Sequence, residues 1–221
     1  MHMSCNHKFY EFLNLDRLDF KPNTLIIGTF NPEWPENNQA EWFYGRTHDS
    51  YGKPNNNFWD VLPRVYGEDS LINNHPTKWK DFCRRNKIAI TDLITTIDDA
   101  YSPKHDKLMG SYSDANIATK FNNHIVTDIV NLLQNHSTIK NIYLTRGSGS
   151  FWNSLWQPIK VYAVANGLHA TQILTPSKFA RFAMFPFNRE NPQQTFNMAS
   201  LNNFILYKWQ QQWHDLKSSE E

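Results

Sequence analysis

The stretch Thr24-Leu-Ile-Ile-Gly-Thr29 is a short apolar run that follows Lys21-Pro-Asn23 and ends at a glycine. Such a run is typical of a strand that is buried on both faces of a parallel sheet and meets a loop at its end. Three later runs have the same character, at residues 88–94, 139–145 and 170–174. Each is short and is followed by a polar or glycine-containing loop, so the sequence predicts four strands.

Segments with helical spacing separate these runs. Phe58, Leu62 and Val65 share one face after a cluster of asparagines, and a second helix is expected after Pro76-Thr77. Further helices are expected over residues 125–133, 151–164 and 196–216. Strands that alternate with helices indicate a parallel sheet covered on both faces, with right-handed crossovers. The predicted fold class is therefore α/β, a three-layer αβα arrangement around a four-stranded parallel sheet.

Length and composition are consistent with this fold. The chain has 221 residues, which suits one domain over residues 1–221. Hydrophobic residues make up 40% of the chain, with 15 Phe, 9 Tyr and 8 Trp, so a core can form and wholesale disorder is excluded. The formal net charge of +1 neither indicates nor excludes a nucleic-acid partner, because local patches attract polyanions.

The two cysteines limit the kinds of site that the chain can build. Cys5 and Cys83 cannot make a disulfide framework of several bridges, nor a four-cysteine zinc or iron–sulfur site. No apolar run approaches the ~20 residues of a membrane span, and the first residues lack an apolar signal core. Any metal would need mainly His or carboxylate ligands. We expect a cytoplasmic protein.

Ligands of such sheets bind beyond the carboxyl ends of the strands, which directs attention to the loops there. These loops are expected at residues 30–57, 95–113, 146–150 and 175–187. The first begins with Gly28-Thr-Phe-Asn-Pro-Glu-Trp34 and ends with Tyr51-Gly-Lys-Pro-Asn-Asn-Asn-Phe-Trp59. Alone, its asparagines are typical turn and helix-capping residues. In the same way, Asp92 is consistent with a residue that caps a turn, and Arg146 with a solvated surface residue.

Together these stretches resemble motifs of the uracil-DNA glycosylase superfamily. Its mismatch-specific uracil and thymine members and its hypoxanthine members carry a Gly-x-Asn-Pro or Gly-Ser-Phe-Pro loop, and then His-Pro-x-Asn-x-Phe-Trp. A strand ending in Thr-Asp-Leu and an Asn-Pro-Ser-x-x-x-Arg stretch follow. The similar stretches here are Gly28 to Pro32, Tyr51 to Trp59, Ile90-Thr-Asp-Leu-Ile94 and Thr175-Pro-Ser-Lys-Phe-Ala-Arg181. Four motifs in the same order, over residues 24–181, are more specific than any one of them.

The resemblance implies a DNA glycosylase of base excision repair, a monomer that uses no metal and no organic cofactor. Such an enzyme binds DNA, flips out uracil or another deaminated base and hydrolyses its N-glycosidic bond. It gives the catalytic roles to Asn31, which would orient water, and to Asn56, which would contact the base. Base-binding roles go to Tyr51, to Phe30 as a second stacking residue, and to Ser177. DNA-binding roles go to Lys53, Lys178, Phe179 as an apolar wedge, and Arg181.

Departures from the family pattern leave alternatives open. One extra residue separates Gly28 from Asn31, and Lys53 stands where the family has His. Phe43-Tyr44-Gly45 is a rival to Tyr51 for the stacking position. A catalytically silent relative that binds nucleic acid or nucleotides is one alternative function, and a nucleoside or nucleotide hydrolase with Glu33 as its acid is another.

Overall fold

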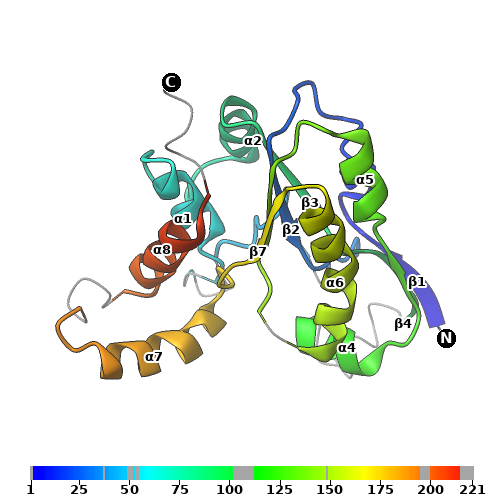
Figure 1. Ribbon diagram of the computed structural model, residues 1–221. Helices are drawn as coiled ribbons and strands as arrows, with labels where there is room; N and C mark the ends of the chain where they lie inside the picture. The colour runs from blue at the N-terminus through cyan, green and yellow to red at the C-terminus, as the bar shows by residue number, and fades with distance from the viewer. Residues whose placement is uncertain are drawn as a thin grey trace.

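A parallel sheet of four strands organises the computed structural model (Figure 1). The structure describes residues 2–36, 38–48, 52, 55–101, 112–147, 149–194 and 200–214. The strand order is β3-β2-β6-β7, and every neighbouring pair is parallel. The strands are β2 (Thr24–Gly28), β3 (Ile88–Asp92), β6 (Asn141–Leu144) and β7 (His169–Gln172). All four strands predicted from the sequence are confirmed.

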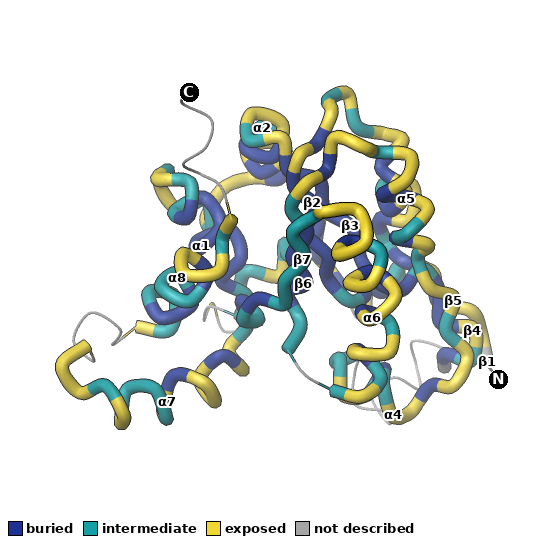
Figure 2. Tube along the Cα trace, in the orientation of Figure 1, coloured by how far each residue is buried: buried dark blue, intermediate teal, exposed yellow. Residues whose placement is uncertain are grey.

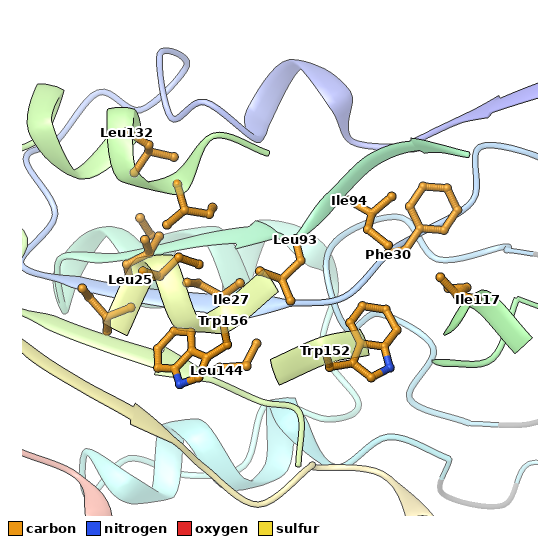
Figure 3. Packing of buried hydrophobic residues seen from close by; sticks show 14 of the residues in the cluster. Leu25, Ile27, Phe30, Leu93, Ile94, Ile117, Leu132, Leu144, Trp152 and Trp156 are labelled. Atoms are coloured by element: carbon orange, nitrogen blue, oxygen red, sulfur yellow. The ribbon is translucent and has the colours of Figure 1, made fainter. Parts of the chain in front are cut away.

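Helices cover both faces of this sheet. One face carries α1 (Phe58–Val65), α2 (Pro76–Arg85) and α8 (Leu201–Gln212), and the other carries α5 (Ile129–Asn135) and α6 (Ser150–Ala165). Side chains of β2 alternate between the two layers. Leu25 and Ile27 pack with Trp152 and Trp156 of α6, as Figure 3 shows, whereas Ile26 belongs to the opposite core. The predicted three-layer αβα fold is confirmed.

A second, antiparallel sheet was not predicted. Its order is β1-β4-β5, formed by β1 (His2–Asn6), β4 (Ile94–Tyr101) and β5 (His124–Val126). The expectations of a loop beginning at residue 95 and of a helix beginning at residue 125 are therefore wrong. Helix α5 starts only at Ile129, because the Asp128 side chain accepts a hydrogen bond from the Asn131 amide and caps the helix there.

The segment after β7 also differs from the prediction. Residues 175–187 were expected to form a loop, but a 3₁₀ turn η2 (Lys178–Ala180) leads directly into helix α7 (Arg181–Glu190). The remaining elements are η1 (Tyr10–Phe12) and α4 (Asp114–Lys120). Figure 2 shows buried strands at the centre and many exposed positions along α7. Among the described helices, none is long and apolar enough to cross a membrane.

Candidate functional site

The carboxyl ends of the parallel strands bring distant loops to one edge of the sheet. Gly28 at the end of β2 lies in register with Asp92 at the end of β3, and Ile27 lies in register with Leu144 of β6. The loops that follow these strands therefore start from the same edge, where parallel sheets bind ligands.

Asp92 is the buried centre of the edge. The residue is 2% exposed, and its Oδ2 accepts hydrogen bonds from His7 Nε2 and Asn31 Nδ2, both at 2.7 Å. The Phe9 amide donates to His7 Nδ1 at 3.0 Å, so the hydrogen bonds place the imidazole proton on Nε2. A carboxylate held by a histidine N–H and an asparagine amide is thus buried directly beside the Asn31 loop.

Asn31 is held from both ends of its side chain. Nδ2 donates to Asp92, and Oδ1 accepts from Nδ2 of the buried Asn38 at 3.3 Å. The Asn31 carbonyl accepts from the Lys8 amide at 2.8 Å. One N–H and one lone pair of the Asn31 amide have no partner in the described part of the chain. The side chain is therefore fixed in orientation and still able to bind a water molecule.

Gly28 has a steric role at this edge. A Cβ atom at this position would collide with Asp92 Oδ1 and would lie 2.8 Å from the Tyr44 hydroxyl oxygen. Only glycine lets the carboxylate and the phenol approach the end of β2 so closely.

Tyr44 connects the Asp92 region to helix α1. Its ring stacks on Phe58 with 3.8 Å between centroids and 4° between planes, and its hydroxyl shares a 2.8 Å hydrogen bond with Thr145 Oγ1. Burial, followed by the charge of Asp92, raises the pKa of Tyr44 well above its ordinary value. The phenol therefore keeps its proton at neutral pH.

Tyr51 and Lys53, which were predicted to bind base and DNA, lie outside the described residues.

A second charged group lies beside the first. Asp114 Oδ1 accepts from Thr29 Oγ1 at 2.8 Å, and Arg146 Nε lies 3.2 Å from Asp114 Oδ2. Burial raises the pKa of Asp114 and the Asp92 charge adds to the rise, whereas the Thr29 hydrogen bond and the Arg146 charge oppose it. Arg146 is thus an ion-pair partner at the sheet edge rather than a solvated surface residue.

Phe30 has a different environment from the one expected of a stacking residue. Its side chain is 8% exposed and belongs to the core near Ile94 and Ile117, as Figure 3 shows. Its ring meets the His7 ring edge to face at 5.7 Å. The described geometry gives it a packing role, and its contact with a base stays a prediction.

The two motifs around Asn56 and Ser177 meet, although they are far apart in the sequence. The two residues form an antiparallel bridge, and the Asn57 amide donates to the Pro176 carbonyl at 2.7 Å. Asn56 Oδ1 accepts from the Phe58 amide at 2.9 Å, which orients the side chain at the start of α1. Among the described residues its Nδ2 has no hydrogen-bond partner. Its catalytic role stays a prediction.

Ser177 and the residues after it form the far rim. Ser177 Oγ accepts from Thr175 Oγ1 at 3.1 Å and from the Phe179 amide at 3.4 Å, so the hydroxyl shapes the start of η2. Lys178, Phe179 and Arg181 are all exposed, as a DNA contact requires. Contact with DNA stays a prediction for each of them.

The sequence alone did not point to His7 or Asp114, and it did not indicate the roles of Asp92, Tyr44 and Arg146 at this edge, because all of these depend on tertiary contacts. His7 reaches Asp92 across 85 positions of sequence, and Tyr44 was only a rival candidate. Asp114 and Arg146 gave no local signal that they form an ion pair. Within the described ranges, no group of three or more His, Cys, Asp and Glu side chains is placed to hold a metal ion.

Comparison with known proteins agrees with this geometry at the level of the fold. A solution NMR structure from Methanosarcina acetivorans, titled a "putative Uracil DNA glycosylase", superimposes with a TM-score of 0.50. The match covers 86% of this chain and 92% of that one, at 17% sequence identity. The chain has a uracil-DNA glycosylase-like fold. No protein-family model matches the sequence, and no curated protein matches it significantly.

Proposed function

We propose that this protein is a DNA glycosylase that hydrolyses the N-glycosidic bond between deoxyribose and uracil or another deaminated base. The observation that supports this most is the joining of the motif residues at one sheet edge. Asn31 is bonded to Asp92, and Asn56 is bridged to Ser177. The contacts of Tyr44 with Phe58 and Thr145 lie between these two pairs. The uracil-DNA glycosylase-like fold gives independent support.

The proposed chemistry separates an oxocarbenium-like sugar from an anionic base. An asparagine cannot take a proton from water at neutral pH, so Asn31 serves to orient the attacking water. Its Nδ2 donates to Asp92 and its Oδ1 accepts from Asn38, so the second lone pair of Oδ1 is the acceptor for a water hydrogen. The buried Asp92 charge stabilises the developing positive sugar in a site of low dielectric. Most of the rate enhancement is then electrostatic.

The orientation of Asn56 suits the recognition of deaminated bases. One lone pair of its Oδ1 accepts from the Phe58 amide, whereas its Nδ2 has no partner among the described residues and serves as the donor toward a base. Deamination replaces an exocyclic amino group by a carbonyl, so the product base offers an acceptor where the parent base offered a donor. A donor from Asn56 would therefore favour uracil or hypoxanthine over cytosine or adenine.

The branch within the superfamily is part of the proposal. The resemblance favours the mismatch-specific uracil and thymine branch or the hypoxanthine branch. The rival function is a silent relative that binds nucleic acid without cleaving it. Two features favour that rival, since Asn31 is not a carboxylate and Lys53 replaces the family's His.

A panel assay tests the proposal. Purified protein is incubated with oligonucleotides that carry uracil, hypoxanthine, xanthine or a thymine mismatch, and abasic sites are then cleaved with alkali. We expect strand cleavage with at least one deaminated base and its loss in Asn31→Ala. Asn202→Ala is the matched control, because Asn202 also donates to a carboxylate, Asp60 Oδ2 at 2.9 Å. Binding without cleavage for every base would identify the silent relative.

A further inference from the structure

Turn η2 and helix α7 together present three aromatic rings to solvent. The exposed fractions of Phe179, Phe182 and Phe185 are 58%, 77% and 61%. Their spacing of three residues places them on neighbouring turns of one side of η2 and α7. The rings of Phe179 and Phe182 are 6.4 Å apart with 15° between their planes. Large apolar side chains grouped on a surface in this way mark an interaction site.

The opposite side of α7 holds the helix in place. Met184 is buried, and Phe187 packs on α8, with its ring 5.3 Å from Phe204 and 5.6 Å from Tyr207. Figures 1 and 2 show α7 beside α8, with exposed positions along its length. The exposed phenylalanines therefore belong to a helix that already packs against α8 through its other side.

The charges around these rings are positive. Lys178, Arg181 and Arg189 are exposed, and Glu190 is the one acidic residue between positions 175 and 190. In the described part of the chain none of the three cations forms an ion pair. The Lys178 ammonium lies 6.0 Å from the Phe179 ring centre. Rings flanked by unpaired cations are complementary to a strand that carries both bases and phosphates.

The surface formed by the three phenylalanines and three cations of η2 and α7 is adjacent to the proposed site. This surface begins directly after Ser177, which is bridged to Asn56. A strand whose base lies near Asn56 can therefore continue onto the rings of η2 and α7.

We propose that η2 and α7 bind an unpaired DNA strand, with bases stacked on Phe182 and Phe185 and phosphates held by Lys178, Arg181 and Arg189. The identity of the substrate as single-stranded or locally unpaired DNA rests on the proposed glycosylase function. Bases in a duplex already cover one another's faces, whereas those of a single strand are free to stack on aromatic side chains. The three rings span only about two helical turns, a small apolar face for a helix that lies in a membrane surface.

Fluorescence anisotropy with undamaged DNA tests this surface separately from catalysis. The full-length protein is titrated into a labelled single strand and into the matching duplex. We expect Phe182→Ala/Phe185→Ala to weaken single-strand binding at least about 5-fold, the lower end of the loss of one base stack, with a smaller effect on duplex. Val161→Ala/Val164→Ala is the matched control, because these side chains are 57% and 71% exposed on α6.

The cations have their own readout. Arg189→Ala should lower the slope of log affinity against log salt by about 0.7 for a single strand, as expected when one phosphate contact is lost. An unchanged slope together with unchanged affinity would show that Arg189 makes no phosphate contact. Circular dichroism melts of all variants confirm that each remains folded.

Three results would overturn the inference. Wild-type affinity of the double phenylalanine variant for single strands would refute it whether or not the protein excises bases. Loss of binding to vesicles containing anionic lipid, with DNA binding unchanged, would assign the surface to a membrane. A change from dimer to monomer, again with DNA binding unchanged, would assign it to a second copy of the chain. If the double phenylalanine variant loses single-strand binding but the wild type releases no base in the panel assay, the glycosylase function is rejected and the strand-binding role of η2 and α7 is supported.

Discussion

Asp92→Asn tests the electrostatic core of the site with almost no change of shape. Asp92 Oδ2 accepts two hydrogen bonds of 2.7 Å, from His7 and from Asn31. Bonds to a charged acceptor contribute about 1.5–3 kcal/mol each and neutral ones about 0.5–1.5 kcal/mol. Replacing the carboxylate by an amide therefore weakens the pair by about 2 kcal/mol, partly offset because a buried charge is no longer desolvated. For a chain of this size, about 1–2 kcal/mol lowers Tm by roughly 2–8 °C.

The expected catalytic loss is much larger than this change in stability implies. With a usual unfolding free energy of about 5–15 kcal/mol, the variant remains folded at 25 °C. Removing one preorganised electrostatic group from an active site slows the chemical step by about 10²–10³-fold. We expect a loss of that size in single-turnover excision, measured on the best substrate of the panel, with DNA affinity nearly unchanged.

Thr91→Val is the control for this variant. Thr91 is fully buried one position away on β3, and its Oγ1 donates to the Leu13 carbonyl at 2.8 Å. Its loss should cost about 1 kcal/mol of stability, while excision stays at the wild-type rate. A lower Tm for Asp92→Asn with full excision activity would refute the reasoning and leave Asp92 as a structural residue only.

The other predictions concern the rim of the site and the core. Asn56→Ala should cost about 1 kcal/mol of stability, because its Oδ1 accepts from the first amide of α1, and should lower excision far more. A lower Tm with full activity would leave Asn56 a structural role alone. Tyr51→Ala should weaken binding of a flipped base by about 1–3 kcal/mol, and a loss of that size in Tyr44→Ala with none in Tyr51→Ala would transfer the stacking role to Tyr44. Burial raises the pKa of the Cys5 thiol from 9.0 to about 12, and that of Cys83 also rises. The native state keeps these protons, whereas the unfolded state loses them above pH ~9. Urea denaturation should therefore show the unfolding free energy falling between pH 9 and 12, by up to about 1.4 kcal/mol per pH unit for each thiol. Cys5→Ala should reduce that fall, and an unchanged pH dependence would contradict the burial of its thiol.

The parallel sheet was predictable because its signal is local. Each strand is a short apolar run next to a loop, and burial on both faces makes the run continuous in sequence, as in Leu25, Ile26 and Ile27. Helix α7 was not predictable by the same logic. Its apolar residues Phe182 and Phe185 face solvent, so the pattern of a core-facing helix is absent, and Pro186 within it favours a loop in a sequence-based interpretation.

The site divides in the same way. Asn31 and Asn56 stand in motifs with a recognisable order, so the sequence singled them out. The role of His7 depends on β1 pairing with β4, where Cys5 lies opposite Ile97, which brings the start of the chain to the end of β3. Tyr44 itself has a φ of 57° and its hydroxyl bonds to Thr145; sequence patterns do not indicate this backbone conformation for a tyrosine. Contacts made by such long-range packing leave no local pattern.

Detection of the released base itself tests the proposed glycosylase activity most directly. Wild-type protein is held in excess over an oligonucleotide with one deaminated base, and the free base is quantified by mass spectrometry over time, beside Asn31→Ala and Asn202→Ala. We expect one free base for each abasic site formed by the wild type and by Asn202→Ala, and almost none with Asn31→Ala. An oligonucleotide that is bound but stays intact, for every base of the panel, would contradict the proposed activity.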